Sequence, residues 1–455
     1  MLTPLEPWIQ AKIGAAAGCR RSPDLQAYQL ERLRQTIRQG REKSRFYARH
    51  LLNAPEDLSS LEDLARFPFT TPDDLRKEGQ GLLCVPQGEI QRVVTLDTSG
   101  TMGDPKRIYF TRADQELTID FFQHGMSTFT QAGDRVMILL PCERPGSVGD
   151  LLAIALERLG AIPARYGPAH NPQDAIAVMD SKRCNVIVGA PTNMLTLARI
   201  WENGSGSPRS KPGQVLLTTD YVPEAIVAVL ERIWGCTVYN HYGMTEMGLG
   251  GGVECQARIG YHLREADLYF EIVNPQTGQP LQEGDRGEVV FTTLTRQGMP
   301  LIRYRTGDLS RFIPGPCPCG STLRTLEKIT CRLDGQVPVH ISQGKGADSR
   351  PIFPMISMAD LDEALFPLSQ VLNFSARLTS QDGKDRLEII LTVLPKTKPE
   401  IASQALLALE SIAAIQISRQ AGFLEVDIAT QEFGASRTRG LGKRMILDQR
   451  GKNHA

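Results

Sequence analysis

Apolar residues recur in two different rhythms along this chain, and the first rhythm fills its middle. Between residues 93 and 242, short apolar runs such as 135–141 and 185–191 alternate with segments such as 150–160 and 224–235, in which apolar residues have helical spacing. Strands that alternate with helices in this way are typical of a parallel sheet covered on both faces. Ligands bind such sheets at the carboxyl ends of the strands. We therefore expect a binding site in the loops that follow these strands.

The second rhythm follows residue 260, where apolar runs are separated by turn residues. The runs DLYFEIV, GEVVFTTL and MPLIRYR (299–305), with the turns PQTGQP and EGDRG among them, predict antiparallel strands. A hairpin pattern around QDGKD and a helical segment then predict a small α+β unit. The predicted fold class is therefore α/β. It has a large N-terminal domain (residues 1–333) of mixed or parallel sheets layered with helices plus an antiparallel β subdomain, and a small α+β C-terminal domain (334–455).

Composition and charge exclude several classes of partner. The chain is 41% hydrophobic and 22% charged, which is ordinary for a globular protein. Lysine plus arginine and aspartate plus glutamate number 51 each, so the zero formal charge indicates no nucleic acid and no anionic membrane partner. The N-terminus lacks a signal-peptide pattern, and no apolar stretch approaches the roughly 18 residues of a spanning helix. Nine cysteines without a secretory signal predict a cytoplasmic protein whose thiols are buried or bound to metal.

The segment TSGTMGDPK, residues 98–106, combines hydroxyl groups, two glycines and one lysine after a predicted strand. Bare backbone, hydroxyl donors and a cation are the parts that wrap a phosphate. The segment is not a Walker A loop, because only two residues separate Gly100 from Gly103. On its own it is equally consistent with a plain hairpin turn.

Two further motifs carry carboxylates. In YGMTE (242–246), Thr245 could hydrogen-bond a substrate oxygen, and Glu246 could hold Mg²⁺ together with water and phosphate oxygens. In YRTGDL, Asp308 could accept two hydrogen bonds from a ribose diol. Taken alone, each motif also fits a surface loop or turn with a solvated acid.

Taken together and in this order, the three motifs resemble those of the adenylate-forming superfamily of acyl-CoA ligases. The stretch GEVVFTTLTRQGMPLIRYRTGDLSRFIPGPCPCG is similar to the phenylacetate-CoA ligase branch almost residue for residue. The resemblance covers roughly residues 90 to 450 and is strongest from 237 to 334. It implies an enzyme with ATP-binding and acid-binding sites in the large domain and a rotating C-terminal domain.

The resemblance implies roles for the residues of the first two motifs. Six residues match the mobile loop that wraps the ATP phosphates: Thr98, Ser99, Gly100, Thr101, Gly103 and Lys106. Tyr242 matches the aromatic residue near adenine, and Gly243 and Met244 continue this nucleotide-binding segment. Thr245 matches the residue that touches the α-phosphate, and Glu246 matches the magnesium ligand.

Other implied roles come from residues further along the chain. Thr219 and Asp220 match part of a turn near adenine, where the family usually has a Gly-Ala-Glu-like sequence. Asp308 matches the ribose-binding carboxylate, and Arg332 matches an arginine near the ribose. Asp334 matches the hinge about which the small domain rotates. In GLGKRMILD, Lys443 matches the catalytic lysine that bridges the substrate carboxylate and the α-phosphate.

The reaction that the resemblance implies is ATP-dependent activation of a carboxylic acid, of the aryl or arylacetic type. An acyl-adenylate forms with release of pyrophosphate, and CoA then accepts the acyl group. The expected partners are the acid, ATP with Mg²⁺, and CoA, and the family's usual homodimer is expected. Two alternatives stay open. An unusual segment after Asp334 favours another acceptor or adenylation alone, whereas a non-catalytic nucleotide-binding protein is disfavoured by retention of Lys106, Glu246, Asp308 and Lys443.

Four residues could form a structural zinc site. PGPCPCG supplies Cys317 and Cys319, and VECQARIGYH supplies Cys255 and His262. Three thiolates and one imidazole make a closed tetrahedral set for Zn²⁺. The alternative is four unrelated loop residues, because C-x-C is less diagnostic than C-x-x-C. Some members of the resembling branch carry the same pairing of segments.

Few residues in the sequence indicate which carboxylic acid binds. The run GLGGG (248–252) lies where the resemblance places the acid, and glycine leaves room or lets backbone approach. The alternative is a flexible loop. His241 and His124 could touch substrate, although a packed histidine is the simpler interpretation.

Overall fold

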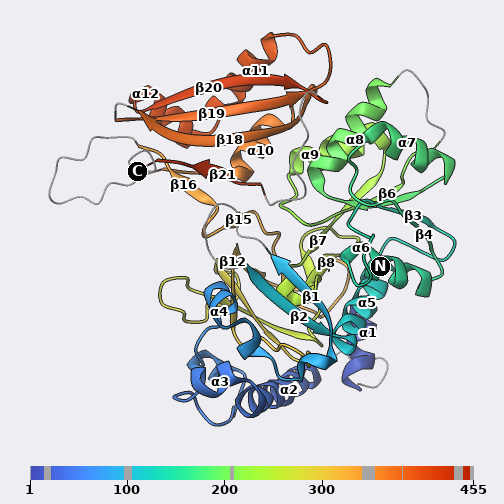
Figure 1. Ribbon diagram of the computed structural model, residues 1–455, viewed down its shortest axis with the longest axis vertical. Helices are drawn as coiled ribbons and strands as arrows, with labels where there is room; N and C mark the ends of the chain where they lie inside the picture. Colours follow the sequence, from blue (N-terminus) through green and yellow to red (C-terminus); the bar gives the residue numbers. More distant parts are fainter. Residues whose placement is uncertain are drawn as a thin grey trace.

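A nine-stranded sheet forms the centre of the large N-terminal part (Figure 1). The computed structural model describes residues 2–14, 22–96, 105–204, 210–340, 354–381, 383–434 and 444–450. The strand order is β13-β14-β9-β8-β7-β6-β5-β3-β4, and the strands from β4 to β7 are parallel. The strands are β3 (Arg135–Ile138), β4 (Ile162–Arg165), β5 (Val186–Gly189), β6 (Gln214–Leu217), β7 (Thr237–Tyr242), β8 (Gly252–Glu254), β9 (Tyr261–Leu263), β13 (Phe312–Ile313) and β14 (Thr325–Leu326). The associated helices are α5 (Arg112–Met126), α6 (Val148–Arg158), α7 (Pro172–Ser181), α8 (Pro191–Asn203) and α9 (Glu224–Trp234).

Antiparallel strands and the N-terminal helices complete this part. One sheet has the order β10-β11-β12-β15, formed by β10 (Leu268–Val273), β11 (Gly287–Thr293), β12 (Tyr304–Ser310) and β15 (Cys331–Arg332). A separate ribbon pairs β1 (Ile90–Leu96) with β2 (Lys106–Thr111). The N-terminal helices are α1 (Leu5–Ile13), α2 (Ser22–Lys43), α3 (Arg45–His50) and α4 (Pro72–Glu78). Short 3₁₀-helical segments among the described residues are η1 (Glu62–Arg66), η2 (Gly79–Leu82), η3 (Gln87–Glu89) and η4 (Thr245–Met247).

One predicted strand is displaced. The sequence placed a strand at 299–305, but β12 begins at Tyr304 and carries the RTGD motif itself. The cause is Arg303, whose backbone takes a left-handed φ of 48°. Its buried guanidinium pairs with Glu271 at 2.9 Å and donates to the carbonyl of Phe67 at 2.8 Å. These contacts turn the chain immediately before the strand starts.

A second, smaller unit follows, drawn in orange and red in Figure 1. Its sheet has the order β20-β19-β18-β21, formed by β18 (Val371–Gln381), β19 (Lys384–Val393), β20 (Leu424–Glu432) and β21 (Ile446–Asp448). Its helices are α10 (Met358–Leu365), α11 (Glu400–Glu410) and α12 (Ala413–Gln420), and β16 (Gln336–Pro338) pairs with β17 (Met355–Ser357). The α/β fold class is confirmed. The domain boundary at residues 333/334 stays a prediction.

Buried apolar side chains connect the two units. One cluster contains residues of α8 and α9 together with residues of α10 and β18, such as Leu195, Ile226, Leu361 and Phe374. In the part of the chain that the structure describes, no single helix has the length and apolarity to cross a membrane. The bent pair α11 and α12 reaches that threshold only when its two helices are taken together.

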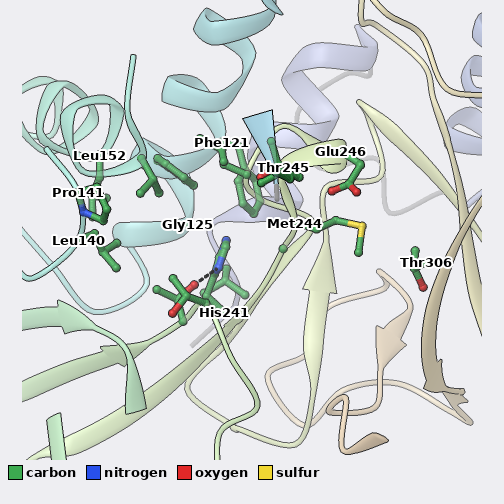
Figure 2. A pocket seen from close by; sticks show the side chains of 18 of the residues that line it. Phe121, Gly125, Leu140, Pro141, Leu152, His241, Met244, Thr245, Glu246 and Thr306 are labelled. Atoms are coloured by element: carbon green, nitrogen blue, oxygen red, sulfur yellow. Dashed lines mark hydrogen bonds between the residues drawn. The ribbon is translucent and has the colours of Figure 1, made fainter. Parts of the chain in front are cut away.

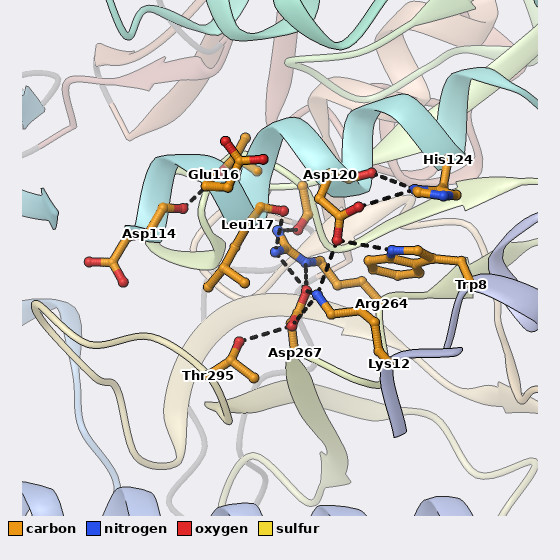
Figure 3. Close-up of polar contacts among 12 residues, drawn as sticks. Trp8, Lys12, Asp114, Glu116, Leu117, Asp120, His124, Arg264, Asp267 and Thr295 are labelled. Carbon is orange, nitrogen blue, oxygen red and sulfur yellow. Dashed lines mark hydrogen bonds and ion pairs between the residues drawn. The ribbon is translucent and has the colours of Figure 1, made fainter. Parts of the chain in front are cut away.

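A buried charge network fastens α1 to α5 and to the start of β10 (Figure 3). Asp267 accepts from Lys12 Nζ at 2.9 Å, from Arg264 Nη2 at 2.9 Å and from Thr295 Oγ1 at 2.9 Å. Lys12 also reaches Asp120 on α5 at 3.3 Å. The Asp267 side chain is only 2% exposed. Its negative charge compensates the two cations beside it, and these cations in turn make the burial of Asp267 tolerable.

We predict that Asp267→Ala lowers the free energy of unfolding by about 3–5 kcal/mol, because it leaves the buried Arg264 without its counter-charge and Lys12 with Asp120 alone. Urea unfolding followed by circular dichroism measures the change. The control is Asp285→Ala in an exposed turn, which should stay within about 0.5 kcal/mol of wild type. Equal stability of the two variants would contradict the network's role.

Candidate functional site

A cavity of about 950 Å³ lies at the carboxyl ends of the parallel strands, between α5, α6 and β12. One end is lined by apolar side chains: Phe121, Phe122, Met126, Leu140, Val148, Leu152, Val188, Leu216 and Val253. The other end is lined by polar and charged groups: Lys106, Thr245, Glu246, Tyr304, Thr306 and Arg332. Figure 2 shows Leu152 on one side of His241, and Glu246 and Thr306 on the other. The cavity therefore joins an apolar compartment to a charged one.

Glu246 is the buried carboxylate of the charged end. It lies in η4, just after β7, and forms an ion pair with Lys106 of β2. The Tyr304 hydroxyl of β12 donates to Glu246 Oε1 at 3.0 Å. Burial opposes ionisation of Glu246, but the attraction of Lys106 and the hydrogen bonds outweigh it, so the pKa of Glu246 is lowered. The charged end therefore presents an ionised carboxylate beside the Lys106 side chain.

Asp308 lies one layer behind the cavity wall. It is 4% exposed, and its Oδ2 accepts a hydrogen bond from the Tyr242 hydroxyl at 2.8 Å. Its Oδ1 forms an ion pair with Arg332, which does line the cavity. The Tyr242 ring is buried against Tyr261, with ring centroids 5.6 Å apart. A nucleotide sugar could reach Asp308 only after the Arg332 side chain moved.

The end of β6 forms the rim between the two compartments. Thr219 lines the cavity with a φ of 79°, a conformation that β-branched residues rarely adopt and that is concentrated at functional sites. The Thr218 hydroxyl lies 2.9 Å from His241 Nδ1. Burial and then the charge of Arg264 lower the pKa of His241 to about 4, so the ring is neutral. His241 is thus packed and hydrogen-bonded, and it also forms part of the cavity wall.

The structure brings most of the described candidate residues together. Eight of them line the cavity: Lys106, Thr219, Gly243, Met244, Thr245, Glu246, Arg332 and Asp334. Tyr242 and Asp308 lie directly behind that wall, and Asp220 follows Thr219. Six candidates lie outside the described residues: Thr98, Ser99, Gly100, Thr101, Gly103 and Lys443. His124 is separate, because its ring stacks on Trp8 on the α1 side of α5.

Sequence reasoning missed Tyr304 and Thr306. Together with Asp308 they occupy alternate, buried positions of β12 and share one face of that strand. The signal was present in YRTGDL, because a strand through this motif predicts that residues two apart point the same way. The strand predicted at residues 299–305 ends before Thr306, so the prediction does not place Tyr304 and Thr306 on one strand.

The four candidate zinc ligands converge outside this cavity. Cys255 follows β8, His262 lies on β9, and Cys317 and Cys319 lie between β13 and β14. Cys255 Sγ is 3.6 Å from Cys317 Sγ, and Cys319 Sγ is 3.4 Å from His262 Nε2. All four ligand atoms lie within 4.8 Å of one another. Strand pairing of β14 with β9 holds the two loops together at this point.

The fold and the site define the class of protein. The AMP-binding enzyme family matches residues 83–295. The chain aligns over 95% of its length with 91% of a 2-hydroxyisobutyryl-CoA ligase in the postadenylation state, with a TM-score of 0.75 and 22% identity. A structure of that ligase in the thioesterification state aligns over the same shares of both chains with a TM-score of 0.64 and 23% identity. These similarities identify the fold of an AMP-binding enzyme.

Sequence similarity identifies the family of AMP-binding enzymes to which the chain belongs. The chain is 34% identical over 321 residues to a phenylacetate-coenzyme A ligase of Aromatoleum evansii, which covers 68% of this chain and 71% of the relative. The chain belongs to the phenylacetate-coenzyme A ligase family of AMP-binding enzymes. The family predicted from the three motifs is confirmed.

We predict that Lys106→Met raises the pKa of Glu246, because burial then acts without its main counter-charge. Since the wild-type folded pKa is lowered, Glu246 stabilises the native state above its unfolded pKa of about 4.3, and this contribution is lost as pH falls through the folded pKa. The variant should therefore lose about 3–5 kcal/mol at pH 7 and less at pH 4. Urea unfolding at both pH values is the measurement.

Lys77→Met, at an exposed position of α4, is the matched control for charge and chain length and should change little at either pH. A stability loss in Lys106→Met that did not depend on pH would show that packing, and not the ion pair, is what the substitution removes.

Proposed function

We propose that this protein uses ATP to convert a carboxylic acid into an acyl-adenylate with release of pyrophosphate, and then transfers the acyl group to CoA. The observation that carries the proposal is the single cavity with an apolar and a charged end. Aromatic and aliphatic side chains such as Phe121, Leu152 and Val188 line the apolar end, which favours an acid with an aryl or arylacetic body. The charged end has the cations and donors that a triphosphate needs.

In the adenylation step, a carboxylate oxygen of the acid attacks the α-phosphorus of ATP, and the bond from that phosphorus to the pyrophosphate oxygen breaks. No general base is needed, because the acid is ionised near neutral pH. Thr245 donates to the α-phosphate, and Lys106 turns from Glu246 to the outer phosphates. Mg²⁺ held by Glu246 would supply charge compensation as pyrophosphate leaves. Lys443 would bridge the acid and the α-phosphate, which is electrostatic catalysis by a positioned cation.

The segment that carries Lys443 supports this role indirectly. Arg444 forms an ion pair with Asp362, and Met445 lines the cavity. We propose rotation about Asp334 for the CoA step. A homodimer and a cytoplasmic location remain predictions.

We predict phenylacetate-dependent exchange of radioactive pyrophosphate into ATP by the wild-type protein, followed by AMP release that requires CoA. Lys443→Ala should lower exchange about 10²- to 10³-fold, by analogy with loss of one charge-stabilising donor. Lys398→Ala, an exposed lysine of the same unit, should retain wild-type exchange. Exchange without CoA-dependent AMP release would select another acceptor, and no exchange with any aryl acid would refute the proposal.

We further propose that Cys255, His262, Cys317 and Cys319 hold one structural Zn²⁺. The Cys255 Sγ–Cys317 Sγ distance of 3.6 Å and the Cys319 Sγ–His262 Nε2 distance of 3.4 Å are close to the edge of roughly 3.8 Å expected for a tetrahedron with Zn–S bonds of about 2.3 Å. All four residues are donors that zinc prefers. The ion would clip the β8–β9 connection to the β13–β14 connection and would take no part in the reaction.

We predict one zinc ion per chain by inductively coupled plasma mass spectrometry of protein purified without chelator. Changing Cys317 and Cys319 together to serine should abolish zinc and lower the melting temperature. Cys142→Ser, which alters a cysteine outside the cluster, should retain zinc. The site would be excluded if the wild-type protein contained no zinc and had the same melting temperature as the variant with serine at positions 317 and 319.

A further inference from the structure

The helix α10 of the C-terminal unit is fastened to the large unit through Glu363. Its carboxylate accepts hydrogen bonds from the backbone N–H groups of Glu224 and Ala225, at 2.8 and 2.9 Å. It also accepts from the Tyr221 hydroxyl at 2.6 Å. Three donors of the large unit therefore converge on one side chain of the small unit.

These contacts supply what α9 lacks. The first N–H groups of a helix have no partner within the helix, and a side chain just before the helix usually caps them. The residue in that position is Pro223, which gives no side-chain hydrogen bond. Glu363 replaces the local cap from another part of the sequence, and its negative charge suits the N-terminal end of the helix dipole. The α9 cap is therefore complete only while α10 is docked.

A second contact holds the C-terminal end of α10, three residues beyond Glu363. Arg199 of α8 is 1% exposed, and its Nη2 donates to the carbonyl of Phe366, the C-terminal cap residue of α10, at 2.6 Å. The guanidinium is thus placed at the negative end of the α10 dipole. Among the described residues, Arg199 has no carboxylate partner for an ion pair. Two contacts in the C-terminal half of α10 thus join this helix to α8 and α9.

The segment next to the predicted catalytic lysine depends on this helix. Asp362, the neighbour of Glu363 on α10, forms an ion pair with Arg444, whose guanidinium also lies 4.5 Å from the Phe374 ring centroid. The next residue, Met445, lines the cavity. A chain of contacts therefore runs from the start of α9 through α10 to the C-terminal wall of the cavity.

We propose that Glu363 is a positioning residue for adenylation: by capping α9 it holds the C-terminal unit where Arg444 pairs with Asp362 and Met445 lines the cavity. This inference rests on the proposed acid–CoA ligase activity. A cap of this kind shifts an equilibrium by about 2- to 30-fold, which is enough to bias the arrangement of the two units and small enough to be released for the CoA step. Glu363 thus favours the first half-reaction and not the second.

The experiment separates the two half-reactions in Glu363→Ala and Glu363→Gln. Phenylacetate-dependent ATP–pyrophosphate exchange should fall about 5- to 30-fold in the alanine variant and less in the glutamine variant, which keeps one acceptor oxygen. Single-turnover thioester formation from supplied phenylacetyl-adenylate and CoA should be unchanged or faster. Backbone hydrogen exchange of the peptide that contains Glu224 and Ala225 should accelerate in the alanine variant.

Two further variants keep the test decisive. Tyr221→Phe removes one of the three donors and should lower exchange in the same direction by a smaller factor, so the inference remains testable if Glu363→Ala does not fold. Glu400→Ala, at the exposed start of α11 in the same unit, should match wild type in every assay.

Unchanged exchange, or an equal fall in both half-reactions, would overturn the positioning role while leaving the ligase activity in place. A wild-type protein without acid-dependent exchange would refute the proposed function itself and the role of Glu363 with it. Faster amide exchange at the start of α9 in that case would still identify the cap as purely structural.

Discussion

The buried carboxylate of Glu246 is the point at which separate parts of the molecule meet. Lys106 reaches it from the ribbon of β1 and β2, Tyr304 reaches it from β12, and Glu246 itself follows β7 of the large sheet. A buried carboxylate is tolerated only with such partners. The same constraint that fixes these elements therefore leaves a cation and an anion side by side at the charged end of the cavity.

The position of the apolar end of the cavity depends on charged contacts outside the cavity. One face of α5 supplies Phe121, Phe122 and Met126 to the cavity, while Asp120 on the opposite side is fastened to Lys12 and Trp8 of α1. Arg264 connects the two faces, since it lies over the Phe121 ring at 5.1 Å and pairs with Asp267. Charge outside the cavity thus fixes the position of apolar groups inside it.

The sequence predicted those features that depend on local pattern. The strands β5, β6 and β7 were found because buried parallel strands are short apolar runs between helices, and Thr245 and Glu246 were found because they follow such a strand. The zinc ligands were proposed from their chemistry, but only the pairing of β14 with β9 brings the two loops together. Tyr304 was missed because the left-handed turn at Arg303 shifted the strand. The contact of Glu363 with Glu224 joins residues from different units, and no local pattern encodes it.

The central claim is that one cavity holds both the nucleotide and the acid. A crystal structure of the protein with a non-hydrolysable phenylacetyl-adenylate analogue tests it most directly. We expect the phenyl ring between Phe121 and Val188, the phosphate mimic beside Thr245, and the ribose hydroxyls in contact with Asp308 after Arg332 has moved. An analogue bound elsewhere, or a phenyl ring at the charged end, would contradict it.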